Sequence, residues 1–140
     1  MHENPEQALA LRVGIALACL RRPVVRAFAG CGQSRRRELH LVDSMADTIA
    51  GDLGRSLAFW RDGTKVIRSR VARYVASVLL TVPESLARDW CAVDANIRDH
   101  ARLAIGASIS ARLLERYTVT PDARPVIVPA ANVWCGISEI

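Results

Sequence analysis

The strongest constraint on the fold is a periodic pattern that runs from Glu84 to Tyr117. Its positions alternate spacings of four and three residues without interruption: Leu86, Trp90, Val93, Ile97, His100, Ala104, Ala107, Ala111 and Leu114. This heptad spacing is typical of an α-helix that packs against another helix. An unbroken helix of this length would span roughly 50 Å. We therefore expect it either to break near residues 91–96 or to pack against a partner chain.

Helical spacing recurs in the rest of the chain, and proline or glycine separates the segments. It predicts helices over residues 5–20, 35–53 and 64–82, with shorter helical pieces over 23–29 and 56–61. Asp62 and Gly63 form a turn signal between the predicted helices over 56–61 and 64–82. The sequence therefore predicts an all-α fold of five or six helices.

The C-terminal residues have a different character. Pro121, Pro125 and Pro129 are incompatible with a continuous helix there. A chain of 140 residues fits one domain. We predict a single helical domain over 1–117 and an irregular tail over 118–140, in which residues 126–128 form one short strand.

Positive charge is concentrated between Arg21 and Arg73. This segment holds eleven arginines and one lysine against five acidic residues, whereas each flank carries one net negative charge. A basic block between nearly neutral flanks is typical of a surface that meets phosphate. The predicted phosphate contacts are Arg35, Arg36, Arg37, Arg61, Lys65, Arg68, Arg70 and Arg73.

Two segments have the spacing of a helix-turn-helix motif. In the first, Ala50 is the small residue between the helices, Gly54 makes the turn, and Trp60 is the apolar residue ten positions after Ala50. In the second, Ala87 and Ile97 are ten residues apart, but a cysteine stands at the turn. The alternative is a plain helical bundle whose arginines only contact water.

A third pattern joins a basic run to a short signature further along the chain. The basic run is Ser34-Arg35-Arg36-Arg37, and the later segment is Arg61-Asp62-Gly63-Thr64-Lys65-Val66. Together they resemble the DNA-binding domain of the bacterial replication initiator DnaA, whose signature runs Arg-Asp-His-Ser/Thr-Thr-Val. Here Gly63 replaces the His and Lys65 replaces the second Thr. The resemblance implies phosphate contacts from the three consecutive arginines and groove contacts near Arg61 and Lys65.

The cysteines do not suggest a metal site. Cys19, Cys31, Cys91 and Cys135 lie far apart, without a Cys-x-x-Cys pair, so a metal centre or a disulfide framework is not expected. Cys19 and Cys91 stand in apolar surroundings, which predicts small core residues.

The signals for catalysis are equally weak. His40 lies between Glu38 and Asp43, where it could act as a general base, but ordinary surface groups are the favoured interpretation. His100 falls in the heptad pattern, which predicts a core histidine. The segment from Gly30 to Ser34 lacks the Lys-Ser/Thr of a P-loop. We expect no catalytic residue, metal or cofactor.

These patterns favour a small bacterial or phage DNA-binding regulator in the cytoplasm, with double-stranded DNA as its partner. Arg12 interrupts the apolar run over 8–20, so neither a signal peptide nor a membrane span is expected. The alternative is a helical protein–protein interaction module, such as an adaptor, an inhibitor or an immunity-type protein, whose basic patch meets an acidic protein. The heptad pattern from Leu86 to Leu114 would then support a homodimer.

Overall fold

The computed structural model describes residues 4–122, which form six α-helices and a small antiparallel sheet. The helices are α1 (Pro5–Ala18), α2 (Arg22–Ala29), α3 (Val42–Gly54), α4 (Arg68–Leu79), α5 (Glu84–Trp90) and α6 (Ala95–Arg116). A 3-10 helix, Leu39–Leu41, precedes α3, and the strands are β1 (Leu57–Arg61), β2 (Thr64–Lys65) and β3 (Thr118–Pro121). The predicted helical content is confirmed, but the sheet means that the fold is not purely all-α. None of the described helices combines the length and hydropathy needed to span a membrane.

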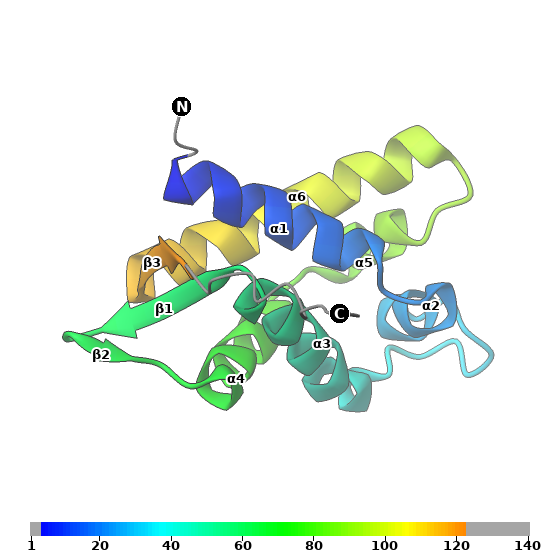
Figure 1. The fold of residues 1–140 in the computed structure, drawn as a ribbon. Helices are drawn as coiled ribbons and strands as arrows, with labels where there is room; N and C mark the ends of the chain where they lie inside the picture. The colour runs from blue at the N-terminus through cyan, green and yellow to red at the C-terminus, as the bar shows by residue number, and fades with distance from the viewer. Residues whose placement is uncertain (1–3, 123–140) are drawn as a thin grey trace, which may run out of the picture.

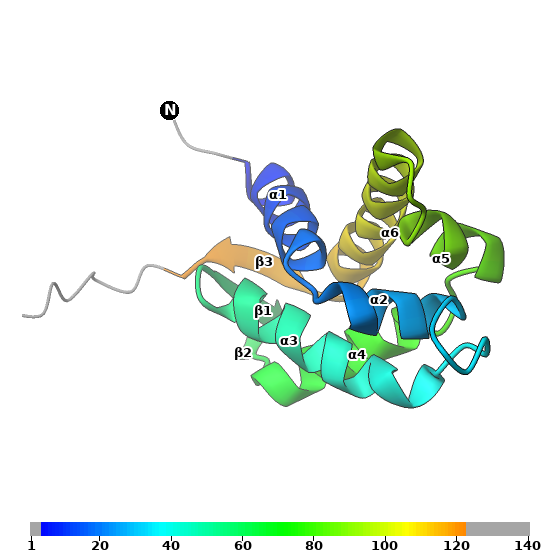
Figure 2. The same cartoon turned by 90° about the vertical axis from the view of Figure 1, so that its right-hand side faces the viewer.

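The helices are arranged in two layers. α1 and α6 lie side by side in one layer, and α3 and α4 pack against each other in the second (Figures 1 and 2). α2 and α5 close one end of the molecule, and the sheet lies at the other end (Figure 1). A single core is formed between the layers, and its fully buried side chains include Phe28, Leu53 and Ile105.

The segment after α3 is a β-hairpin, so the prediction of a helical piece over 56–61 is wrong. Asp62 and Gly63 both have positive φ angles, 52° and 78°, as the two-residue turn between adjacent antiparallel strands requires. β3 pairs with the other edge of β1 and places Phe59 opposite Val119. This pairing joins residues about sixty positions apart, which a local helical pattern cannot reveal.

The sheet also extends the folded part of the chain past residue 117. β3 occupies Thr118–Pro121, and the backbone N–H of Asp122 donates a hydrogen bond to the carbonyl of Ser56 at 2.9 Å. The first residues of the predicted tail therefore belong to the domain. The predicted strand over 126–128 lies outside the described residues.

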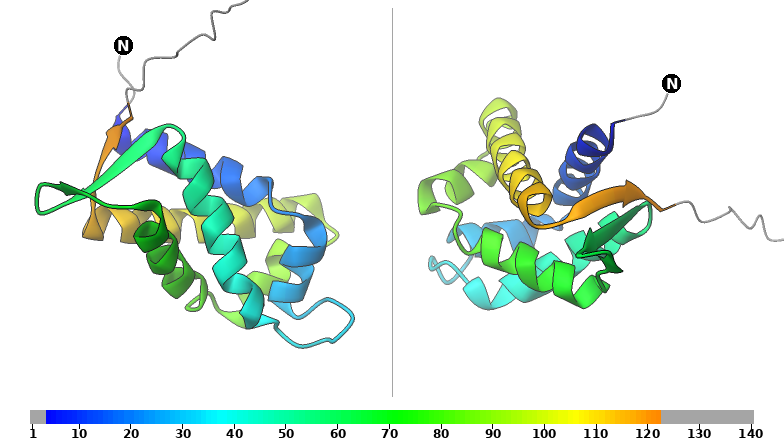
Figure 3. Two further views of the ribbon diagram at one scale, coloured as in Figure 1. Left: turned by 60° about the horizontal axis from the view of Figure 1, so that its bottom comes forward. Right: turned by 90° about the vertical axis from the view of Figure 1, so that its left-hand side faces the viewer.

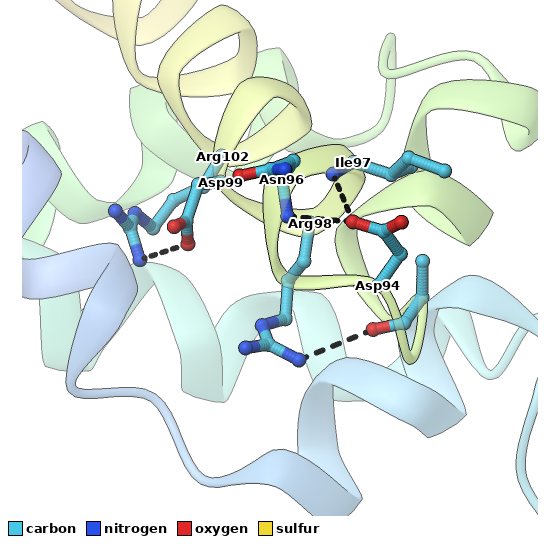
Figure 4. Close-up of polar contacts among 7 residues, drawn as sticks. Asp94, Asn96, Ile97, Arg98, Asp99 and Arg102 are labelled. Carbon is cyan, nitrogen blue, oxygen red and sulfur yellow. Dashed lines mark hydrogen bonds and ion pairs between the residues drawn. The ribbon is translucent and has the colours of Figure 1, made fainter.

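The long heptad pattern is divided between α5 and α6, so of the two alternatives that the sequence left open, the break near residues 91–96 is the one found. Asp94 has an extended backbone, and its Oδ1 accepts hydrogen bonds from the backbone N–H groups of Asn96 at 2.8 Å and Ile97 at 3.3 Å (Figure 4). A side-chain acceptor at this position starts a new helix, because it satisfies N–H groups that have no partner inside the helix. Arg98 adds a hydrogen bond from Nη1 to the Ala92 carbonyl at 3.3 Å.

Most heptad positions of α6 do not face the core; Leu114, near the end of the helix, is half-buried and packs against it. The side chains that pack inward are Ala101, Ile105, Ile109 and Leu113, whereas Ile97, His100, Ala104, Ala107 and Ala111 are exposed. The heptad line therefore marks the outer face of α6. The prediction that His100 is a core histidine is wrong.

Candidate phosphate-binding site

The predicted basic residues are divided among three places in the structure. Arg35, Arg36 and Arg37 lie in the loop between α2 and α3. That loop and the β1–β2 hairpin are at opposite ends of the molecule (Figures 1 and 3). The remaining five residues lie near the hairpin and α4, on two different hollows. The predicted basic block therefore does not form one continuous surface.

Three of the predicted residues come together in one hollow of about 520 Å³, which we call the arginine pocket. Arg61, Arg70 and Arg73 line it together with Arg116, the last residue of α6. The other lining residues are Val66, Tyr74, Ser77 and Tyr117. None of the described residues that line the pocket is acidic.

Helical spacing and strand pairing bring these side chains together. Arg70 and Arg73 are three residues apart on α4 and therefore share one face of that helix. Trp60 pairs with Thr118 across the sheet, and its Nε1 donates a hydrogen bond to Thr120 Oγ1 at 2.8 Å. Because β1 ends at residue 61 and α6 ends just before β3, the β1–β3 pairing brings the arginines at positions 61 and 116 to the same corner.

Three aromatic rings pack against one another at the pocket, and two of them, Tyr74 and Tyr117, line it. The Tyr74 and Tyr117 rings meet edge to face with centroids 5.8 Å apart, and Phe59 meets Tyr117 in the same way at 5.9 Å. Tyr74 is fixed further because its hydroxyl donates to the Arg112 carbonyl at 3.1 Å. The Arg116 guanidinium lies 4.9 Å from the centre of the Tyr74 ring, in cation–π range. The rings orient this guanidinium and leave its N–H groups able to bind an anion.

The positive charge of the arginine pocket is almost uncompensated. Its closest ion pair joins Arg61 Nε to Asp62 Oδ2 at 4.0 Å, and that carboxylate is 95% exposed. Such an exposed contact contributes little. Within residues 4–122, the guanidinium groups of Arg70, Arg73 and Arg116 form no ion pair. Three neighbouring guanidinium groups without an ion pair, beside a fourth with only an exposed one, favour an anionic ligand.

A second hollow, of about 780 Å³, lies between α3, the hairpin and the start of α4; we call it the mixed-charge cleft. Its ionisable lining residues are Asp47, Asp52, Arg55, Lys65, Arg68 and Asp122. Arg68 pairs with Asp47 at 3.1 Å, and Arg55 lies 3.8 Å from Asp52. Gly51 lies beside the first pair, and a Cβ there would be 3.4 Å from Arg68 Cζ. Two of the predicted phosphate contacts, Lys65 and Arg68, therefore lie in a nearly neutral hollow.

Arg37 has a structural role, and its guanidinium is partly committed to contacts within the fold. Its Nε donates to the Phe28 carbonyl at 3.0 Å and its Nη1 donates to the Val82 carbonyl at 3.1 Å. The guanidinium also lies 4.7 Å from the centre of the Phe28 ring. These contacts tie the α2–α3 loop to the end of α2 and to the chain after α4. Arg35 and Arg36 are exposed at the tip of that loop.

The helix-turn-helix spacings do not correspond to such a motif in the structure. After Gly54 the chain enters β1, so the first pattern lacks its second helix. In the second pattern, α5 and α6 are two helices joined by a turn. Ile97, however, is 46% exposed where the motif needs a buried residue between its helices. The residues that carry the resemblance to DnaA, Arg61 to Val66, form the hairpin and the residue after it.

The histidine and cysteine residues considered in the sequence analysis do not form a catalytic or metal site within the described part of the chain. His40 is exposed and lies 3.9 Å from Glu38, and Asp43 is also exposed. Within the described part of the chain, no group of three His, Cys, Asp or Glu side chains could hold a metal ion. Cys91 is buried as predicted, but Cys19 is exposed, so its assignment to the core is wrong.

Arg116 is the member of the pocket that sequence reasoning missed. It lies 43 positions after Arg73, outside the basic block, and only the β1–β3 pairing brings it to Arg61. No local signal marks this contact. Comparison with protein-family models, curated proteins and solved structures finds no match to this chain.

Proposed function

We propose that this protein binds the phosphate backbone of double-stranded DNA through the arginine pocket. The observation that carries the proposal is the cluster of four arginines without an acidic residue among the described lining. Planar guanidinium groups match phosphate oxygens in a bidentate manner. Contacts of this kind give affinity and position without reading sequence.

A neighbouring hollow extends the pocket along the surface. It has a volume of about 530 Å³, shares Arg61, Tyr74, Arg116 and Tyr117 with the pocket, and is also lined by Trp60, Asp62 and Glu115. The two acidic side chains make this neighbouring hollow less favourable for a polyanion, so the proposed phosphate contacts are confined to the arginine pocket. A regulatory role, as the sequence suggests, would follow from binding DNA in this way.

The salt dependence of binding tests the proposal. Fluorescence anisotropy with a labelled mixed-sequence duplex should show that log affinity falls with log salt concentration with a slope of about −3 to −4, if four phosphates are neutralised. Affinity should then fall about a hundredfold between roughly 50 and 200 mM salt. Absence of binding at the lower salt concentration, or a slope near zero, would contradict DNA binding.

A competition experiment separates DNA from an acidic protein partner. Unlabelled duplex and poly-L-glutamate are compared as competitors at equal total charge. DNA should compete far better, because two arginine N–H groups match phosphate geometry and the duplex presents charges at fixed spacing. If the polypeptide competes as well as DNA, the acidic-partner function is favoured instead.

A second candidate function, self-association, is favoured by the outer face of the α1–α6 layer. Leu11 and Ile15 on α1 and Ile97 and Leu103 on α6 are each at least 46% exposed. On α6 this face carries the heptad spacing, which suits packing against a like helix. Large exposed apolar side chains are common at interaction surfaces. We propose a second copy of the chain as the occupant.

Light scattering after size exclusion tests the self-association. The wild-type chain should elute as a dimer, and Leu103→Arg should elute as a monomer because a charge is placed in the apolar contact. Leu80→Arg is the matched control, because Leu80 is also exposed but follows α4. A monomeric wild-type chain at high micromolar concentration, or equal effects of both variants, would exclude this dimer.

A further inference from the structure

Two cysteines from distant parts of the sequence meet where α2 packs against α5. Cys31 follows α2 and Cys91 follows α5. The Phe28 and Trp90 rings, on the same two helices, meet edge to face with centroids 6.0 Å apart. The Cys31 and Cys91 side chains are close enough to interact, and Cys31 packs against the buried cluster that contains Cys91. Neither thiol takes part in the proposed DNA contact.

Local hydrogen bonds fix both cysteines. Gly30 ends α2 in a left-handed conformation with φ 83°, which lets the Cys31 N–H donate to the Arg26 carbonyl at 2.8 Å. Arg26 Nη2 donates in return to the Cys31 carbonyl at 2.9 Å. The Cys91 thiol donates to the Arg88 carbonyl at 3.3 Å. Both cysteines are held by these contacts, so their thiols remain neighbours in the folded chain.

We propose that Cys31 and Cys91 are a modification site that peroxide converts into an intramolecular disulfide. The Cys31 thiolate attacks hydrogen peroxide, so that an S–O bond forms, the O–O bond breaks, and hydroxide leaves and is protonated to water. The Cys91 sulfur then attacks the Cys31 sulfenic acid. The S–S bond forms, the S–O bond breaks, and the departing hydroxide takes the Cys91 proton as a second water. Two thiols are oxidised by one peroxide.

The surroundings of the two thiols set the order of these steps. Cys31 is half-buried, whereas Cys91 is buried. Burial is the main cause that raises the pKa of Cys91 to about 11; the Cys31 thiol adds to the shift and Arg26 opposes it. Cys91 therefore remains a thiol near neutral pH and reacts slowly with free oxidants. Cys31 is the first target of peroxide, and Cys91 resolves the sulfenic acid.

The disulfide would act on the α2–α3 loop. It would close a covalent ring of about sixty residues, which restricts the unfolded chain and stabilises the fold. It would also join the start of the loop that carries Arg35 and Arg36 directly to α5. Oxidation would thus fix this loop without changing its charge.

Peptide mapping of the oxidised full-length chain tests the proposal. After treatment with hydrogen peroxide and alkylation of the remaining thiols, trypsin should release residues 27–35 linked to residues 89–98. The monomeric protein should show a Tm increase of at least about 5 °C. Dithiothreitol should reverse both effects.

Matched variants make the result decisive. Cys31→Ser should abolish the linked peptide and the Tm increase, whereas Cys19→Ser, at an exposed site, should retain both. Cys91→Ser should leave Cys31 as a sulfenic acid that dimedone traps. Should that buried substitution prevent folding, the Cys31→Ser comparison suffices. Linkage of Cys31 to Cys19 or Cys135, links between chains, or sulfinic acid at Cys31 with an intact Cys91 thiol would each overturn the proposal.

Discussion

The arginine pocket and the mixed-charge cleft both adjoin the hairpin and α4, yet their electrostatic properties differ. Four arginines line the pocket without a described acidic residue, whereas three basic and three acidic side chains line the cleft. The acidic residues Asp47 and Asp52 come from α3, which packs along α4 and meets only one of its faces. The number of arginines in a segment is therefore a poor measure of the charge that a surface presents. The charge of a surface depends instead on the side of the helix on which each residue lies.

The largest difference between the two regions is expected for paired alanine substitutions. Arg70→Ala with Arg73→Ala should weaken DNA binding about 10- to 100-fold, because two charge-assisted phosphate contacts are lost. Arg55→Ala with Arg68→Ala removes the same charge from the cleft and should weaken binding about 2-fold. Anisotropy titrations at one salt concentration measure both. Equal losses would show that net charge alone, and not the pocket, governs binding.

Two glycines near these regions, Gly63 in the hairpin turn and Gly54 beside the cleft, should respond differently to alanine substitution. Gly63→Ala should lower the free energy of unfolding by about 1–2 kcal/mol, because its φ of 78° is unfavourable for a residue with a Cβ. Gly54, beside the cleft, has open space around its Cβ position, and Gly54→Ala should leave stability unchanged or raise it by up to about 1 kcal/mol. Urea denaturation gives both values. A neutral Gly63→Ala would show that the hairpin turn is not fixed as described.

Removing the acidic residues of the cleft should make it resemble the pocket. Asp47→Asn with Asp52→Asn leaves Arg68 and Arg55 without their carboxylate partners. DNA affinity should rise about 2- to 5-fold at low salt, and the gain should disappear as salt screens the added charge. Titrations at two salt concentrations measure this change. A decrease in affinity would mean that the Arg68–Asp47 pair supports the binding surface.

The smallest effect is expected at the far end of the molecule. Arg35→Ala with Arg36→Ala should change DNA affinity less than about 2-fold, because the α2–α3 loop is remote from the hairpin and charge effects fall off over about 10 Å at 0.1 M salt. A loss comparable to that of the Arg70 and Arg73 pair would indicate a ligand that spans both ends.

Much of the helical architecture could be predicted from local sequence, and the sheet could not. Pro5, Pro83 and Asp94 mark helix starts through rules that act within one turn. Residues 57–61 instead form a strand because β3, about sixty residues later in the sequence, pairs with them. Local patterns also misplaced the heptad line of α6, since spacing shows which residues share a face but not which face is buried.

The candidate site could also be predicted only in part, because some of its contacts are local in sequence and others are not. Arg70 and Arg73 share a helical face, so their proximity follows from the sequence. For Arg37, which was predicted to contact phosphate, nothing local reveals the Phe28 and Val82 carbonyls that accept its hydrogen bonds. Arg116 was missed because its position depends on the β1–β3 pairing. Contacts within one turn were predictable, and contacts across the fold were not.

The β1–β3 pairing has a consequence for the order in which the nascent chain becomes competent to bind. Arg61 reaches its final place beside Arg116 only when Thr118–Pro121 has been synthesised and has paired with β1. Ribosome-bound intermediates that lack these residues would contain most of the helical core but not the completed arginine pocket. Under the proposed function, the complete set of phosphate contacts would therefore form only after translation has passed β3.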